Sequence, residues 1–254
     1  RKGSDDLLRL FGGRENFPSS IMRAKREHAS VAEDQAAFQS YDKSATVARR
    51  GMGTVYKKLF SAQGKGVHAG ALSRFPQNIG RAVLFLYSEP NALVIDPFAG
   101  HNSRLELCVR NGRNYSGNDI CASFMEFNKR KAAELKIQFP SAKINLHLGD
   151  SRSLQHINTG VGDFTLTSPP YYDVEFYGDE PEQLGKAKSY QLFLGMLKKV
   201  FAENLRVLKP GAFAVWFVND FRRNKQFHPY HMDCTRIGQE VGFQLHDLMV
   251  VDLG

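Results

Sequence analysis

The chain has 254 residues, of which 42% are hydrophobic and 24% are charged, and its formal net charge is +8. This composition is ordinary for a globular protein, and it excludes a disordered chain, a collagen-like fibre and a small disulfide scaffold. The longest apolar runs, such as residues 212–218, are far shorter than the roughly 20 residues of a membrane helix, so we expect no membrane partner. The three cysteines have no metal-ligand spacing, and their odd number suits a reducing compartment, so we expect a cytoplasmic protein without a metal site.

The positive charge is concentrated in the first quarter of the chain. Residues 1–70 contain 13 Lys and Arg against 7 Asp and Glu, which accounts for +6 of the total. The strand signal is poor throughout this segment, and a charged helical stretch begins at Ile21. We therefore predict a basic, mainly helical arm over residues 1–70, which would contact the phosphates of DNA without reading its sequence. Residues 71–254 would form one domain.

Apolar runs alternate with amphipathic segments from Phe75 onward. The periodicity predicts helices over residues 77–87, 103–111, 123–139, 190–208 and 231–241. It predicts strands over residues 92–95, 114–119, 143–148, 163–167, 212–218 and 243–251. The strand at 212–218 is the most apolar and is expected to be central, after a turn at residues 209–211. Strands that alternate with helices imply an α/β fold with a mostly parallel sheet.

Polar residues follow four of the predicted strands at the point where each strand ends. Asp96 and the loop of residues 97–103 follow the first strand, Asp119 the second, Asp150 the third and Ser168 the fourth. Open parallel sheets bind ligands at this edge. Asp119 lies 23 residues beyond Asp96, close to the offset at which an acid reaches a nucleoside ribose. Neither a Gly-x-Gly-x-x-Gly motif nor a Walker lysine is present, which favours a nucleoside cofactor without phosphates.

Two motifs in this order resemble those of the amino-directed DNA methyltransferases, which use S-adenosylmethionine. The first is similar to the family's cofactor loop and consists of Asp96, Pro97, Phe98, Ala99 and Gly100. The second begins 70 residues beyond Phe98, is similar to the family's catalytic tetrapeptide, and consists of Ser168, Pro169, Pro170 and Tyr171. The resemblance covers residues 75–254 and implies a Rossmann-like class I methyltransferase fold with DNA as partner.

The resemblance also implies further cofactor contacts. They are Phe75 and Pro76 at the methionine end, Asn102 and Ser103 after the loop, Asp119 and Ile120 at the ribose, and Asp150 near the adenine amine. The run from His101 to Arg104 departs from the family pattern. Asn102 can replace a left-handed glycine there, and Ser103 can cap the next helix. His101 and Arg104 are bulkier than the family's residues and have the bulk to crowd the methionine moiety. We interpret the run as a variant cofactor loop in which His101 is a packing residue and not a catalytic base.

The implied chemistry explains the residue types of the tetrapeptide. An exocyclic amine is a poor nucleophile because its lone pair is delocalised into the ring. The Ser168 hydroxyl and the Pro169 carbonyl would accept the amine hydrogens and free this lone pair. Both prolines fix the backbone φ angle and hold these acceptors in place. Tyr171 would stack on a base flipped out of the duplex.

Several assignments stay open at this point. By resemblance, Ser168 favours cytosine N4 over adenine N6, but a serine hydroxyl accepts hydrogen bonds from either amine. An RNA base methyltransferase would use the same kind of base pocket and is a second alternative. A non-catalytic nucleic-acid-binding subunit is a further alternative, because His101 and Arg104 depart from the family loop. The resemblance implies the cytoplasm of a prokaryotic or phage-infected cell.

The sheet itself is expected to be incomplete. A sheet of this fold ends with one more, antiparallel strand, and the sequence after residue 251 has no room for it. We therefore expect a further C-terminal segment or a second chain to complete the sheet.

Overall fold

The structure is a computed structural model and describes residues 21–23, 75–174 and 179–252. The predicted basic arm over residues 1–70 lies outside these residues, apart from Ile21–Arg23. That short piece forms strand β1 and not the start of the predicted helix.

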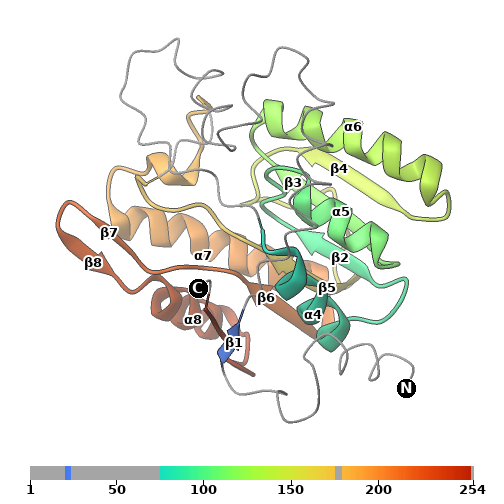
Figure 1. Cartoon of the computed structure of the whole chain (residues 1–254). Coiled ribbons are helices and arrows are strands. Elements are labelled where there is room, and N and C mark those ends of the chain that lie inside the picture. The colour runs from blue at the N-terminus through green and yellow to red at the C-terminus, as the bar shows by residue number, and fades with distance from the viewer. Residues whose placement is uncertain (1–20, 24–74, 175–178, 253–254) are drawn as a thin grey trace.

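A five-stranded parallel sheet forms the centre of the molecule (Figure 1). Its strands are β2 (Leu93–Asp96), β3 (Asn114–Asp119), β4 (Ile144–Leu148), β5 (Gly162–Thr167) and β6 (Leu208–Trp216). They lie in the order β4-β3-β2-β5-β6, and every pairing is parallel. The predicted α/β class with a mostly parallel sheet is confirmed. The order reverses between β2 and β5, so this Rossmann-like sheet has its ligand-binding switch point there.

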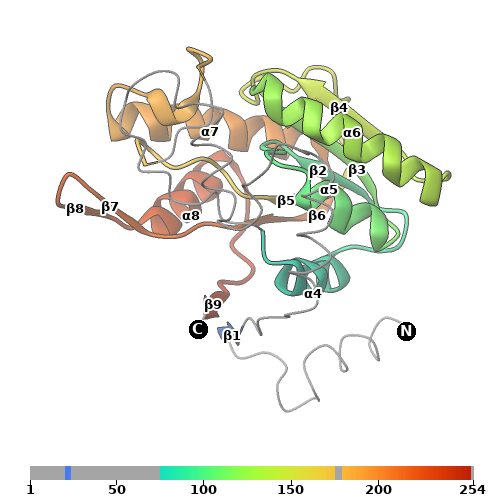
Figure 2. The same cartoon turned by 45° about the horizontal axis from the view of Figure 1, so that its top comes forward.

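Helices cover both faces of the sheet (Figure 2). The first layer consists of α4 (Gln77–Tyr87), α5 (Ser103–Arg110) and α6 (Ala122–Gln138). The second consists of α7 (Tyr190–Val207) and α8 (Tyr230–Val241), which pack against each other. Val94 of β2 packs into the α4–α5 core, and its neighbour Ile95 packs with Val207 of α7. Both side chains are buried, as expected for a strand covered on two faces.

The first four predicted strands and all five predicted helices agree with the structure to within one or two residues at each end. The last two predicted strands, over residues 212–218 and 243–251, need correction. The predicted strand at 243–251 is wrong, since only Val250–Asp252 form a strand, β9, and it pairs with β1 outside the main sheet. Strand β6 is the edge strand of the sheet in the described part of the chain, not a central one. Only Leu208 of β6 is buried, so the apolar run of this strand does not reflect a central position in the sheet.

The predicted turn at residues 209–211 lies within β6 as an irregularity of the ladder. Gly162 of β5 pairs with Leu208, and Phe164 already pairs with Phe213, so the extra residues loop out at Gly211, which has φ +78°. A hollow of about 780 Å³ runs along β6 between α4, α8 and residues 242–251. Completion of this edge by another strand or chain stays a prediction.

An antiparallel hairpin after β6 was not predicted from the sequence. It consists of β7 (Phe221–Arg223) and β8 (Gln226–His228) and projects from one end of the molecule (Figures 1 and 2). A single 3-10 turn at Leu184–Lys186 precedes α7. Among the residues described, no helix is both long and apolar enough to cross a membrane.

Gly80 of α4 allows the helix to approach its neighbours, which generates a prediction. A Cβ atom at Gly80 would lie 2.5 Å from Leu107 Cδ2 and closer still to the Phe75 ring. We expect Gly80→Ala to lower the free energy of unfolding by about 1–3 kcal/mol, because overpacking outweighs the helix propensity of alanine. Gly195 in α7 has open space around it, so Gly195→Ala should be neutral or stabilising. Urea denaturation of both variants checks this, and equal effects would contradict it.

Candidate active site

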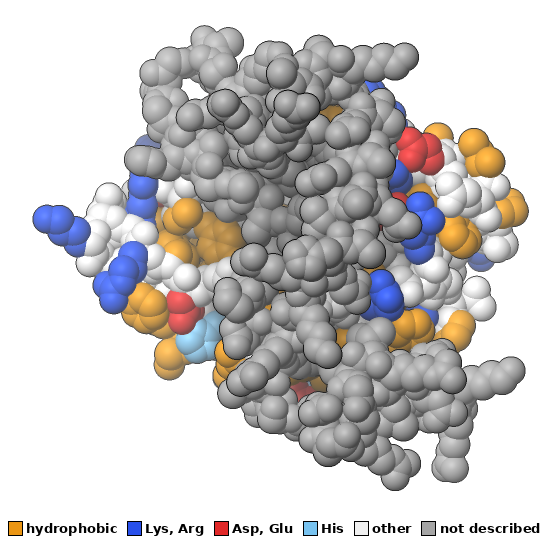
Figure 3. All heavy atoms as spheres, viewed as in Figure 1, with side chains coloured by type: hydrophobic (Ala, Val, Ile, Leu, Met, Phe, Trp, Pro, Cys, Tyr) orange, Lys and Arg blue, Asp and Glu red, His pale blue; other side chains and the backbone are white. Residues whose placement is uncertain are grey.

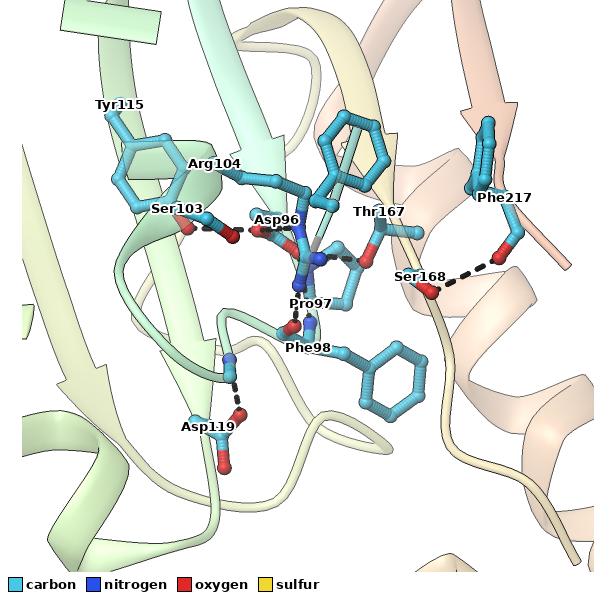
Figure 4. A network of polar contacts seen from close by, with 12 residues as sticks. Asp96, Pro97, Phe98, Ser103, Arg104, Tyr115, Asp119, Thr167, Ser168 and Phe217 are labelled. Carbon is cyan, nitrogen blue, oxygen red and sulfur yellow. Dashed lines mark hydrogen bonds and ion pairs between the residues drawn. The ribbon is translucent and has the colours of Figure 1, made fainter. Parts of the chain in front are cut away.

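The two motifs lie side by side at the switch point of the sheet. The loop of residues 96–100 follows β2, the tetrapeptide of residues 168–171 follows β5, and these strands are paired. The Thr167 hydroxyl donates to Asp96 Oδ1 at 2.7 Å (Figure 4). A direct hydrogen bond therefore joins two segments that lie about 70 residues apart in the chain.

Asp96 is the centre of this network and has no exposed surface. Its Oδ1 accepts from Thr167 and from the Phe98 backbone N–H at 3.2 Å. Its Oδ2 accepts from Arg104 Nε at 2.7 Å and from the Tyr115 hydroxyl at 2.8 Å (Figure 4). Four internal donors satisfy a buried carboxylate, so Asp96 holds the loop in place. A cofactor contact by Asp96 stays a prediction.

Arg104 turns inward under the loop. It is 6% exposed, forms an ion pair with Asp96, and donates through Nη2 to the Phe98 carbonyl. Its guanidinium also lies 5.5 Å from the centroid of the Phe75 ring. Arg104, which departs from the family pattern, therefore stabilises the loop from within.

Tyr115 belongs to the site and was not predicted from the sequence. Burial and then the Asp96 charge raise the pKa of Tyr115 well above its ordinary value, so its hydroxyl remains a donor. Gly117 makes room for the ring, because a Cβ there would lie 2.5 Å from Tyr115 Cε1. The available signal was the alternation along β3, which places residues 115, 117 and 119 on one face.

Asp119 stands at the end of β3, as predicted, and contacts the loop of residues 96–100. Its Oδ2 accepts from the Gly100 N–H at 2.7 Å, and its Oδ1 accepts from the Cys121 N–H at 2.8 Å. Burial raises the pKa of Asp119 to about 6, against these two hydrogen bonds. Each oxygen accepts only one of these bonds and retains capacity for another. Asn128 of α6 braces the other side of the loop by donating to the Gly100 carbonyl at 2.7 Å.

The end of the loop differs from the prediction in two respects. Asn102 has φ −50° and is not left-handed, whereas Gly100 has φ +51°. The N-cap residue of α5 is Asn102, which makes no side-chain capping bond, and Ser103 already lies inside the helix. The Asn102 Nδ2 group is buried and has no partner among the described residues. His101 packs against Phe127 with ring centroids 5.0 Å apart, which confirms its predicted packing role.

Phe75 and Pro76 lie behind the site. Phe75 is buried and contacts the Phe217 ring edge-on at 5.1 Å, and Pro76 is the N-cap residue of α4. This segment supports Phe217, whose backbone carbonyl is a partner of Ser168.

Asp150 is engaged by its own neighbour. Arg152 Nε donates to Asp150 Oδ2 at 2.8 Å, and the Arg152 N–H donates to Oδ1 at 2.9 Å. The adenine contact expected from Asp150 would compete with this pair and stays a prediction. Ile120 is half-buried beside Asp119, where a cofactor contact likewise stays a prediction.

The tetrapeptide presents one oriented hydroxyl. Ser168 is half-buried, and its Oγ donates to the Phe217 carbonyl at 3.1 Å (Figure 4). The Ser168 proton is thereby committed to Phe217, and the lone pairs of the oxygen point elsewhere. The Pro170 carbonyl accepts from the Tyr230 hydroxyl at 3.0 Å. The Pro169 carbonyl accepts from no residue in the described part of the chain.

Tyr171 is half-buried in an aromatic cluster. Its ring lies 5.7 Å from that of Tyr230 and 5.8 Å from that of Phe221, and its hydroxyl accepts from the Asn219 N–H at 3.0 Å. These contacts hold the ring of Tyr171 in place, and its stacking on a base stays a prediction.

Two other features bear on cofactors. Within residues 75–174 and 179–252, no group of three or more His, Cys, Asp and Glu side chains is placed to hold a metal ion. All three cysteines are buried and unpaired, and Cys108 and Cys121 lie in the core as predicted.

No protein-family model matches the sequence, and no curated protein matches it. The structure is similar to that of a SAM-dependent methyltransferase from Aquifex aeolicus, with 15% identity over 76% of this chain and 88% of that chain and a TM-score of 0.47. A TehB-like SAM-dependent methyltransferase from Corynebacterium glutamicum is 16% identical over 76% and 82% of the chains, with a TM-score of 0.43. TrmN from Thermus thermophilus is 16% identical over 58% and 39%, with a TM-score of 0.44. Similarities at this level transfer neither an activity nor a ligand to this chain.

The buried ion pair generates a prediction. Arg104→Met leaves the Asp96 charge buried without its cation, so we expect a loss of about 3–5 kcal/mol in unfolding free energy. Adding Asp96→Asn removes that charge, so the double variant should be more stable than Arg104→Met alone. Arg110→Met is the matched control, because the Arg110–Glu106 pair in the same helix is exposed and should contribute less than about 1 kcal/mol. Chemical denaturation measures all three, and a double variant no more stable than Arg104→Met would contradict the assignment.

Proposed function

We propose that this chain transfers a methyl group from S-adenosylmethionine to the exocyclic amine of a base in DNA, with cytosine N4 as the target. The observation that carries the proposal is the Thr167–Asp96 hydrogen bond at the switch point of the sheet. It sets the motif that resembles a cofactor loop directly beside the motif that resembles a catalytic tetrapeptide. Ligand sites of open α/β sheets lie at such a point.

The residues at the strand ends fit a nucleoside cofactor. Asp119 is a buried acceptor with spare capacity for ribose hydroxyls, and Ile120 beside it is half-buried and apolar. Asp119, Ile120 and the backbone of residues 98–100 would hold S-adenosylmethionine, with Asp96 fixing the loop behind them. When bound, this cofactor supplies a methyl group on a positively charged sulfur.

Ser168 is arranged to act as an acceptor. Because its proton is donated to the Phe217 carbonyl, its free lone pairs can accept a hydrogen from a target amine. The Pro169 carbonyl offers a second acceptor from the same rigid dipeptide. Two acceptors on one amine would localise the nitrogen lone pair, and positioning of the amine would lower the barrier further.

The structure weakens the basis for the non-catalytic alternative. That alternative depended on crowding by His101 and Arg104, and both side chains pack elsewhere: His101 on Phe127 and Arg104 on Asp96. The acceptor geometry serves any exocyclic amine, so adenine N6 and RNA bases are alternative targets. Identification of the methylated nucleoside distinguishes them.

Removing the Ser168 hydroxyl should lower methyl transfer and spare cofactor binding. We expect Ser168→Ala to reduce the transfer rate roughly 10²–10³-fold, as for the loss of one preorganised polar group. Nucleoside mass spectrometry of DNA and RNA from expressing cells identifies the methylated base. The product N4-methylcytosine in DNA supports the proposal, whereas only N6-methyladenine, or methylated RNA alone, would replace the target. Transfer by Ser168→Ala at the wild-type rate would refute the catalytic role.

The raised pKa of Asp119 predicts opposite pH trends for affinity and stability. The carboxylate accepts ribose hydroxyls only when ionised, so cofactor affinity should fall roughly tenfold between pH 7 and pH 5. The folded state favours the protonated form, because the pKa rises from 3.8 to about 6. The associated stabilisation is therefore complete below pH 4 and is lost as the pH rises through 6.

The test compares wild type with Asp119→Asn by calorimetric titration from pH 5 to pH 8 and by denaturation from pH 4 to pH 8. The variant should bind cofactor weakly at every pH, and its unfolding free energy should lack this pH-dependent part. An unchanged affinity of Asp119→Asn at pH 7 would exclude Asp119 from the cofactor site.

A further inference from the structure

We infer that the β7–β8 hairpin is a nucleic-acid contact surface, which binds the phosphates and one unstacked base of a strand beside the active site. The inference rests on the proposed function for its purpose, and it names a substrate contact that the two motifs do not contain. Three features of the hairpin support it: its position beside the tetrapeptide, the different side chains on its two faces, and the backbone conformation of its turn.

The hairpin is anchored to the tetrapeptide. Arg223 Nε donates to Asp173 Oδ2 at 2.8 Å, and Asp173 lies two residues beyond Tyr171. Tyr171 also contacts Phe221 at the start of β7 and accepts a hydrogen bond from Asn219 just before it. A strand bound on the hairpin is therefore held close to the catalytic loop.

The two faces of the hairpin differ in character. Phe221 pairs with His228, and their rings stack 4.9 Å apart on the inner face, where His228 is buried. Arg222 pairs with Phe227 on the outer face, and both are exposed. Alternation along antiparallel strands produces this division, so the inner pair fixes the hairpin and the outer pair is free for a ligand.

The outer face combines a flat aromatic ring with cations that have no counter-ion. Phe227 is 49% exposed, and the Arg222 guanidinium lies 5.3 Å from its ring centroid. Neither Arg222 nor Lys225 has a carboxylate within ion-pair distance in the described residues, whereas Arg223 is neutralised by Asp173. In the space-filling view, Lys and Arg side chains gather at the end where the hairpin projects (Figure 3). Phosphates bind cations and bases stack on exposed aromatic rings, so a nucleic-acid strand matches this face.

The turn of the hairpin carries a lysine where glycine is preferred. Asn224 and Lys225 have φ +50° and +65°, which is the two-residue turn that matches the twist of the strands. Lysine is strained at such a position, and glycine is not. The tip of the hairpin therefore presents an exposed cation on a strained backbone, which is the kind of outlier that motivates a functional hypothesis.

The experiment measures binding without cofactor, so that it is independent of methyl transfer. Fluorescence anisotropy of the full chain with a labelled 20-nucleotide single-stranded DNA, the same sequence in RNA, and a duplex would be followed from 50 to 300 mM KCl. The variants are Arg222→Ala, Lys225→Gly and Phe227→Ala. Lys143→Ala is the matched control, because it removes an exposed cation next to β4, at the opposite edge of the sheet.

We expect Phe227→Ala to weaken binding to the preferred strand roughly tenfold, the effect of losing one stacked base. Arg222→Ala and Lys225→Gly should each reduce the slope of log affinity against log salt by about 0.7 for a single strand. Lys225→Gly should also raise the midpoint of thermal unfolding, since it relieves the turn. Lys143→Ala should change none of these.

Hairpin variants that behave like Lys143→Ala would overturn the inference, whichever nucleic acid binds. If wild type binds through the hairpin but transfers no methyl group, the proposed function fails and this inference stands. If it methylates DNA with hairpin variants unchanged in affinity, the proposed function stands and this inference fails.

Discussion

The site depends on one buried carboxylate, that of Asp96. A buried charge is costly unless hydrogen bonds and a counter-ion satisfy it. Its donors come from four segments: the loop itself, helix α5, strand β3 and strand β5. Satisfying this single charge therefore fixes the loop against its own helix and against the strand that leads into the tetrapeptide. The geometry of both motifs follows from that requirement.

Most of the fold could be predicted from the sequence because helical segments alternate with short strands along the chain, as in an α/β fold. The bounds of α4 and β3 agree with the structure residue for residue. The prediction failed where periodicity carries no information about neighbours. Phe243 and Leu245 alternate with polar residues as in a strand, yet Leu245 is more than half exposed, and residues 243–249 form no strand. The hairpin was missed because its strands have only three residues each.

The location of the candidate site could be predicted, but the hydrogen-bond partners of its residues could not. The rule that ligands bind at strand ends places Asp96, Asp119 and Asp150 at one edge, and all three are there. It does not distinguish an acid that holds the structure from one that faces a ligand. That distinction depends on partners such as Arg104 and Tyr115, which become visible only when the packing is known. A side chain that departs from a family pattern is a place to look for such a partner.

The hydrogen bond between Thr167 and Asp96 has a consequence for folding. The donors to Asp96 occur along the chain in the order Phe98, Arg104, Tyr115 and Thr167, so the last of them leaves the ribosome some 70 residues after the carboxylate. Contacts of long sequence separation form late, because the closing of a large loop has an entropic cost. Until β5 pairs with β2, Asp96 lacks a donor and the two motifs are not joined. A nascent chain therefore joins the two motifs only when its sheet is nearly complete, and ligand binding at the proposed site would report on folding.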